Sequence, residues 1–207
     1  MAVDGSARKR GSYKSSEQVR RRLLEAAIIE FADHGFEGAS TRAIAKRAGA
    51  HQPQINYHFE SKDALWRAAM DMLLEEVDAF ITRPDDATDI RSAMETLIRG
   101  LVHFAAARPE MHRIMIKEAS SPGERLTWLV DTHVRPRYDA FRAGWDALVE
   151  SGHAGPVPPE LAYHLIVGAA SLLHANAPEA EALIGVQASD PATVEAHADA
   201  MVGLFIR

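Results

Sequence analysis

Residues 40–65 combine hydrogen-bonding side chains with helix signals at a spacing that suits contact with double-stranded DNA. Ser40 is a favoured N-cap for a first short helix, and Gly49 supplies the positive φ expected where that helix ends. A second helix follows and directs Ile55 and Phe59 inward at i and i+4. Two helices joined by a short turn containing glycine are typical of a helix-turn-helix, whose second helix lies in the major groove.

The flanking residues make this motif more specific than a lone pair of helices. An amphipathic helix over residues 20–34 precedes it, and Ser61 begins another helix directly after it. Residues 20–66 together resemble the N-terminal domain of the TetR/AcrR family of one-component transcriptional regulators. The residues that carry the resemblance are Leu24, Ala26, Ala27, Phe31, Gly35, Phe36, Thr41, Ile44, Ala45, Ala48, Gly49, Ile55, Tyr57, His58, Phe59, Ser61, Lys62 and Leu65.

The resemblance implies roles for the outward-facing side chains of this region. Amide groups can pair with adenine, so Gln52, Gln54 and Asn56 are expected to read base edges. The other predicted DNA contacts, mainly to phosphates, are Thr41, Arg42, His51, Tyr57, His58 and Lys62. His51 stands where the family usually has Ser or Thr, which predicts a weaker cap for the reading helix. Asn56 stands where the family commonly has Tyr.

The composition supports a DNA-binding protein whose charge is unevenly distributed. The net charge of the 207 residues is −6, yet residues 1–60 carry +3 and residues 61–207 carry −9. DNA affinity depends on Lys and Arg near phosphates rather than on the total charge. The chain has no cysteine, no signal peptide and no apolar run near the ~20 residues of a membrane span. We therefore expect a cytoplasmic protein without membrane contact.

The first 14 residues contain Gly, Ser and the basic residues Arg8, Lys9, Arg10 and Lys14. This composition predicts a disordered segment. It is either a basic arm that follows phosphates or enters the minor groove, or a solvated tail. The predicted domains are this arm (1–14), a helix-turn-helix DNA-binding domain (15–62) and a helical ligand-binding and dimerisation domain (63–207).

The rest of the chain predicts an all-α protein. A long helix begins at Ser61 and ends before Pro84, and further helices follow up to Phe205. Pro136 lies inside the helical pattern of residues 124–150 and is expected to kink or break it. The expected fold is a three-helix DNA-binding head joined to a larger helical bundle, with about nine to ten helices in total.

Two helices near the C-terminus predict a homodimer. Residues 161–173 are apolar nearly all round, and the last helix has an apolar stripe at 3–4 spacing. Either both helices complete the core of one chain, or they meet their copies across a two-fold axis as the resemblance implies. A palindromic operator needs two reading heads, which favours the dimer. The predicted interface residues are Leu165, Gly168, Ala169, Leu172, Ala198, Met201, Val202 and Phe205.

The middle helices are rich in Met, Trp and His, which suit an adaptable apolar cavity for a small molecule. The candidate lining residues are His103, Met115, Trp128, Phe141 and Trp145. The alternative for each of them is an ordinary core position. The histidines are scattered over different helices without close acidic partners at metal-ligand spacing, so no metal site and no cofactor are predicted.

These observations predict a ligand-responsive, DNA-binding transcriptional regulator. The favoured form is a homodimeric repressor that leaves a palindromic operator when a small apolar or amphipathic molecule binds. An enzyme is not expected, because the sequence has no glycine-rich phosphate loop, nucleophile elbow or cysteine nucleophile. The alternatives are a helical small-molecule-binding or scaffold protein that has lost DNA binding, or an all-α enzyme without a recognised motif.

Overall fold

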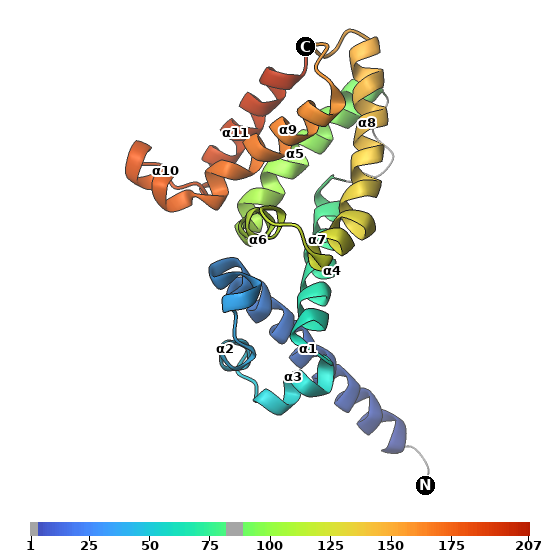
Figure 1. Ribbon diagram of the computed structural model, residues 1–207, viewed down its shortest axis with the longest axis vertical. Helices are drawn as coiled ribbons and strands as arrows, with labels where there is room; N and C mark the ends of the chain where they lie inside the picture. The colour runs from blue at the N-terminus through green and yellow to red at the C-terminus, as the bar shows by residue number, and fades with distance from the viewer. Residues whose placement is uncertain (1–3, 82–88) are drawn as a thin grey trace. The chain divides into compact units, whose positions relative to one another are not determined.

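The computed structural model describes residues 4–81 and 89–207, which fold into two compact units, Met1–Leu73 and Leu74–Arg207. The described residues form eleven α-helices and one π-helical turn, which confirms the predicted all-α class (Figure 1). The division falls inside helix α4 (Lys62–Ile81) rather than at residue 62, so α4 contributes its first turns to the DNA-binding unit. No helix in these two ranges is long and apolar enough to cross a lipid bilayer.

The first unit is built from α1 (Asp4–Gly38), α2 (Thr41–Arg47), α3 (Gln52–His58) and the beginning of α4. The backbone of α1 is interrupted at Gly35, whose φ of 69° is readily reached only by glycine. Apolar side chains from each helix are buried in this unit. They include Leu23, Leu24, Ala27, Ile28, Phe31, Ile44, Ile55, Phe59 and Leu65.

Helix α1 starts earlier than the sequence predicts. It includes residues 4–14, which were expected to form a disordered arm, and no proline interrupts the helix there. Residues 1–3 and the basic side chains of the predicted arm lie outside the described residues. The proposed contact of this arm with DNA stays a prediction.

The second unit is a helical bundle around α5 (Ile90–Ala107). Figure 1 shows α8, α9 and α11 beside α5, and the core side chains of these four helices form one cluster. The other elements are α6 (Pro109–Ala119), α7 (Glu124–Leu129), η1 (Val130–Val134), α8 (Arg135–Glu150), α9 (Pro159–Ala175), α10 (Ala177–Ile184) and α11 (Pro191–Phe205). The largest members of the cluster are Met94, Ile98, Phe141, Trp145, Leu148, Ile166 and Met201.

A π-helical turn, rather than a break, precedes Pro136. In this turn, η1, the N–H of Arg135 donates to the carbonyl of Val130, five residues earlier. Proline has no N–H, and its ring clashes with the carbonyl four residues before it in an ordinary helix. The wider turn accommodates this clash while the chain remains helical from Glu124 to Glu150. The segment thus counts as two α-helices, which explains why one more helix is found than was expected.

Helices α4 and α5 make a backbone contact at Gly100. A Cβ atom built at Gly100 would lie 2.3 Å from the carbonyl oxygen of Phe80 and 3.1 Å from Cα of Ile81. Both of these atoms belong to the backbone and cannot rotate away as a side chain could. Glycine is therefore required for α4 to end against α5.

Candidate nucleic-acid interface and effector cavity

Helices α2 and α3 form the helix-turn-helix by the local interactions that the sequence predicts. The hydroxyl of Ser40 accepts a hydrogen bond from the N–H of Ala43 (3.4 Å), which caps α2. Gly49 adopts a φ of 61° and turns the chain. The N–H of Ala50 then donates to the carbonyl of Ala45 at 2.9 Å. These bonds fix how α3 leaves α2.

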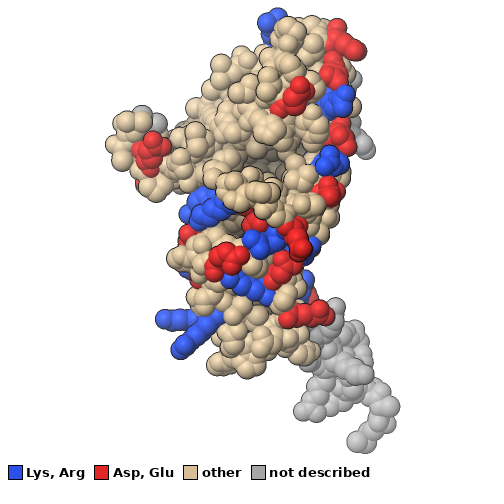
Figure 2. Space-filling view, in the orientation of Figure 1, with Lys and Arg blue, Asp and Glu red and all other residues tan. Residues whose placement is uncertain are grey.

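The outward face of α3 is open at two of the predicted DNA-binding residues. Asn56 is exposed, and 78% of the surface of Tyr57 is exposed. The ring of Tyr57 lies edge-on to that of the half-buried His58, with 5.0 Å between their centroids. Arg42 is exposed on α2, and Figure 2 shows basic side chains projecting from the first unit near this helix. These predicted DNA-binding groups are therefore open to solvent.

Two of the predicted base-reading residues instead make contacts within the unit. The Oε1 atom of Gln54 accepts a hydrogen bond from the N–H of His51 at 2.9 Å. This bond satisfies the N–H of the N-cap residue, which is the part of a capping box that the third helical residue supplies. Nε2 of Gln52 donates to the hydroxyl of Thr41 at 3.0 Å and joins α3 to α2. Among the three predicted base-reading amides, Asn56 is the most exposed.

Lys62, predicted to hold a phosphate, also makes an internal contact. Its Nζ atom lies 4.7 Å from the ring centroid of Phe36 and donates to the carbonyl of Glu37 at 3.3 Å. A cation over an aromatic ring and a bonded carbonyl both stabilise this position. The start of α4 is thereby held against the end of α1.

The buried carboxylate of Glu30 positions α2 and was missed by the sequence reasoning. Glu30 is 5% exposed, and its Oε1 accepts from the N–H of Ser40 at 3.4 Å. Its Oε2 lies 3.8 Å from Nη2 of Arg47, which also lies 3.9 Å from Asp33. One side chain of α1 thus contacts both ends of α2. In the sequence nothing distinguishes Glu30 from Glu25, which is less buried on the same helix.

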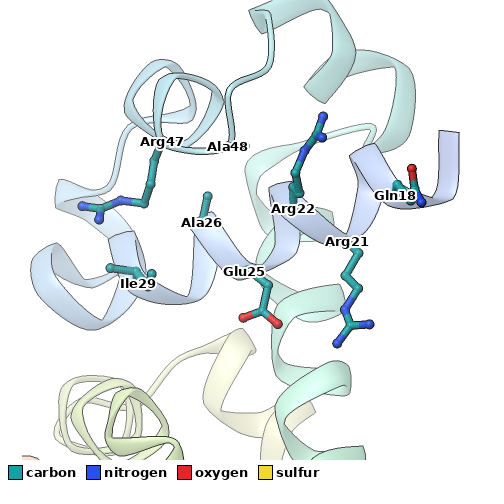
Figure 3. A pocket seen from close by; sticks show the side chains of 8 residues that line it. All are labelled: Gln18, Arg21, Arg22, Glu25, Ala26, Ile29, Arg47 and Ala48. Carbon is teal, nitrogen blue, oxygen red and sulfur yellow. The ribbon is translucent and has the colours of Figure 1, made fainter. Parts of the chain in front are cut away.

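A groove of about 500 Å³ runs between α1 and the end of α2 (Figure 3). Its lining residues are Gln18, Arg21, Arg22, Glu25, Ala26, Ile29, Arg47 and Ala48. Figure 3 shows the side chains of Arg21, Arg22 and Arg47 pointing in different directions. These three guanidinium groups do not converge, so the groove is not built to bind one anion.

The second unit contains a cavity of about 550 Å³ lined by α4, α5 and α8. Most of the lining side chains are apolar, and two are charged. The lining residues are Asp78, Ile81, Ile90, Ala93, Met94, Leu97, Pro136, Arg137, Ala140, Phe141 and Gly144. Both the volume and the small number of polar groups are typical of a small-molecule site.

Of the five predicted lining residues, Phe141 lines this cavity and the other four lie elsewhere. Trp145 is 2% exposed, and its Nε1–H donates to the carbonyl of Val157 at 2.8 Å. His103 lies 3.3 Å from Glu195 on α11. Trp128 packs edge-on against His133, with 5.1 Å between ring centroids, and Met115 is half-buried on α6. Of these four residues, Trp145 fills the core, and His103, Met115 and Trp128 are half-buried away from the cavity.

Arg137 crosses from α8 to α4 at the edge of the cavity. Its Nε and Nη2 atoms donate to the two carboxylate oxygens of Asp78 at 3.0 and 2.6 Å. Nη2 also donates to the carbonyl of Leu74 at 3.0 Å, and Nη1 donates to that of His133 at 2.8 Å. The pairing of Asp78 with Arg137 was not predicted, because 59 residues separate them and no local pattern connects them.

The predicted dimer residues divide between an exposed face and the core. Leu165 and Leu172 on α9 are 54% and 53% exposed, and Ala169 between them is exposed. A Cβ atom at Gly168 would meet no atom within 4 Å. Leu161 of α9 and Leu204 of α11, which were not predicted, extend the exposed apolar surface. Figure 2 shows a largely uncharged surface over α9 and α11.

The prediction for α11 is corrected by the burial of its side chains. Ala198 is fully buried and Met201 is 2% exposed, both within the core of the unit. Val202 and Phe205 are partly buried against the same core. This helix is apolar on two faces, and the predicted stripe is the one that faces the core.

Two histidines connect α9 to α11. Nδ1 of the buried His174 lies 3.0 Å from the carbonyl of Ala188, and its Nε2 lies 3.2 Å from Nδ1 of His197. Nε2 of His197 in turn lies 3.1 Å from the carbonyl of Ala169. Burial lowers the pKa of both histidines, and the nearby charges of His197 and His103 lower the pKa of His174 further.

Mild acid is expected to destabilise the protein through this pair. The pKa of each folded histidine is lower than the ~6.5 of an exposed one, so the unfolded chain takes up protons first as the pH falls. The free energy of unfolding should be at its full value above about pH 6.5 and should decrease below it. Thermal melts between pH 7.5 and 5.5 measure this decrease.

The matched variants for this measurement are His174→Asn and His164→Gln. Asparagine cannot be protonated but can still donate to the carbonyl of Ala188, so His174→Asn should reduce the loss of stability in acid. His164 is exposed on α9, and His164→Gln should leave the loss unchanged. An equally steep loss in His174→Asn would contradict the assignment.

A helix-turn-helix on an all-helical scaffold is typical of DNA-binding transcriptional regulators. Residues 23–69 match the family model described as bacterial regulatory proteins, tetR family. The N-terminal part of the chain is therefore similar to this family, as the resemblance of residues 20–66 predicts.

The relatives are transcriptional regulators rather than enzymes. The regulator RutR of Escherichia coli K12 is 28% identical over 91% of this chain and 89% of its own length. RaaS of Mycobacterium tuberculosis is 45% identical over 59% of this chain and 57% of its own length. AibR, solved in complex with isovaleryl coenzyme A and operator DNA, has a TM-score of 0.71 at 21% identity over 90% of this chain and 98% of AibR. This last likeness shows a shared fold.

Proposed function

We propose that the protein is a cytoplasmic, homodimeric repressor that leaves a palindromic operator when a small molecule enters the cavity between α4, α5 and α8. The observation that carries this proposal is the path of α4. This helix begins at Lys62 beside the helix-turn-helix, and its Asp78 and Ile81 line the cavity. A ligand that binds better to one position of α4 than to another shifts the protein between its DNA-binding and released states.

Two similar proteins support repression as the effect on transcription and a small molecule as the signal. SCO4008 of Streptomyces coelicolor, 32% identical over 53% of this chain and 54% of its own length, is named a transcriptional repressor. AibR binds both operator DNA and an acyl-coenzyme A. A repressor with a ligand cavity is therefore the function that the cavity and the exposed α3 support best.

The exposed leucines of α9 and α11 support the dimer. Leu161, Leu165, Leu172 and Leu204 are each more than half exposed, and an apolar surface of this kind on two neighbouring helices is typical of an interface. Two copies related by a two-fold axis would present two copies of α3 to successive major grooves, about 34–36 Å apart or at a multiple of that spacing.

Replacing Tyr57 with alanine is expected to weaken operator binding at least about tenfold while leaving the fold intact. The side chain is 78% exposed, so its loss removes little packing but removes a contact of the reading helix with the DNA backbone. Fluorescence anisotropy with DNA from the protein's own promoter region measures the affinity, and a salt titration measures the electrostatic share.

The matched control for this test is Leu183→Ala. Leu183 is 77% exposed, but it lies on α10 in the second unit. Its removal should leave both the affinity and the melting temperature unchanged. An unchanged affinity in Tyr57→Ala would contradict the proposed DNA interface.

A further inference from the structure

The charged edge of the cavity between α4, α5 and α8 indicates the chemical class of its ligand. We propose that this ligand is a straight-chain aliphatic carboxylic acid whose carboxylate replaces that of Asp78 on Arg137. The inference rests on the proposed function, because it assumes that this cavity is the effector site. It adds the ligand class and the bond that the ligand breaks.

The composition of the cavity wall selects an amphipathic molecule with an aliphatic body. Nine of its eleven lining residues are apolar, and one of these, Phe141, is aromatic. Each methylene group that such a wall removes from water strengthens binding. The only charged groups among the described lining residues are Asp78 and Arg137, and they lie together at one edge.

The ion pair at this edge selects a carboxylate. The guanidinium group of Arg137 binds the two oxygens of Asp78 through Nε and Nη2, the two-bond geometry in which arginine binds carboxylates. The Arg137 side chain is 25% exposed, so a neutral molecule in place of Asp78 would leave a partly buried charge without compensation. A second carboxylate restores both the charge balance and the two hydrogen bonds.

Asp78 is the partner that can be displaced. Its side chain is 50% exposed, twice as much as that of Arg137, so its carboxylate can be hydrated when it leaves. Nη1 of Arg137 also donates to the carbonyl of His133, four residues earlier in the chain, at 2.8 Å. Arg137 therefore remains at the edge of the cavity while α4 loses its charged contact with α8.

This exchange explains how binding would reach the DNA-binding unit. Arg137 donates to α4 at two places, the carboxylate of Asp78 and the carbonyl of Leu74. A ligand that takes the first of these bonds weakens the connection between α8 and α4, the helix that continues into the helix-turn-helix. The acid then binds better to the released form, as linkage requires.

Calorimetry on the full-length protein tests the ligand class without DNA. The probes are saturated straight-chain acids of six to twelve carbons and their methyl esters. We expect at least one acid to bind about tenfold more tightly than its ester. The variant Arg137→Gln should reduce this preference to nearly one, and Asp78→Asn should bind the acid several-fold more tightly because the competing charge is absent. Equal binding of acid and ester, no binding of any acid, or an unchanged acid affinity in Asp78→Asn would overturn the inference.

Measuring operator affinity shows whether a failed test counts against this inference or against the proposed function. Asp78→Asn should weaken operator affinity even without ligand, since it breaks the same bond that the acid breaks. The control Asp146→Asn changes an exposed carboxylate on α8 that lies 4.0 Å from Arg142, and it should have no effect. A protein that binds its operator but shows no preference for acids retains the proposed function and loses this inference. A protein that prefers acids but binds no operator loses the proposed function alone.

Discussion

Replacing Gly100 with alanine is expected to lower the stability of the protein by roughly 3 kcal/mol, the upper range for an overpacked core position. The new methyl carbon would lie 2.3 Å from the carbonyl oxygen of Phe80, a separation that Cβ atoms do not tolerate. Because the opposing atoms are backbone, α4 and α5 must move apart. Thermal and urea unfolding measure the loss.

The same substitution is expected to alter DNA binding at temperatures where the protein stays folded. Displacing the end of α4 changes the helix that connects the cavity to the helix-turn-helix. The control is Gly144→Ala on α8, where the added Cβ would lie 3.4 Å from the flexible end of Met94. That variant should keep its melting temperature. Equal melting temperatures for Gly100→Ala and the unaltered protein would disprove the close contact.

Introducing a charge at Leu172 is expected to separate the proposed dimer and to reduce operator affinity on the order of 100-fold or more. Leu172 is 53% exposed in the single chain, so Leu172→Glu should fold normally. In a two-fold interface the substitution places two carboxylates in an apolar surface that association removes from water. Sedimentation velocity measures the mass, and anisotropy measures operator binding.

The control for the dimer prediction is Ile116→Glu. Ile116 is 52% exposed, nearly as much as Leu172, but it lies on α6 outside the leucine surface of α9 and α11. This variant should retain both the mass and the affinity of the unaltered protein. A Leu172→Glu protein with the mass of a dimer would show that association uses another surface.

The helix-turn-helix could be predicted because its determinants are local. Ser40 caps α2 and Gly49 turns the chain, and each acts through neighbours within a few residues. The hydrogen bonds at the start of α3 could be predicted only in part. His51 indicated that the usual Ser or Thr was missing, but the bond from its N–H to Oε1 of Gln54 was found only in the structure.

The cavity between α4, α5 and α8 could not be predicted because composition does not distinguish a filled space from an empty one. Trp145 was a candidate for the cavity wall, yet it fills the core and bonds to Val157. Asp78 and Arg137 were not candidates, since only the packing of α8 on α4 brings them together. The dimer prediction failed in part for a similar reason. The helical period identifies an apolar face on α11, but it does not say whether that face meets its own chain or another one.

The π-helical turn before Pro136 has a consequence for the direction of the side chains that follow it. A π-helical turn holds one residue more than an α-helical turn, so it absorbs an extra residue without turning the helix that follows. Deleting one residue within Val130–Val134 would restore ordinary helical winding and leave α8 facing nearly as it does now, so Arg137 and Phe141 would stay at the cavity wall. Pro136 would then clash with the carbonyl four residues before it. The extra residue thus lets the chain carry a proline at the cavity wall while the direction of the ligand-facing side chains is preserved.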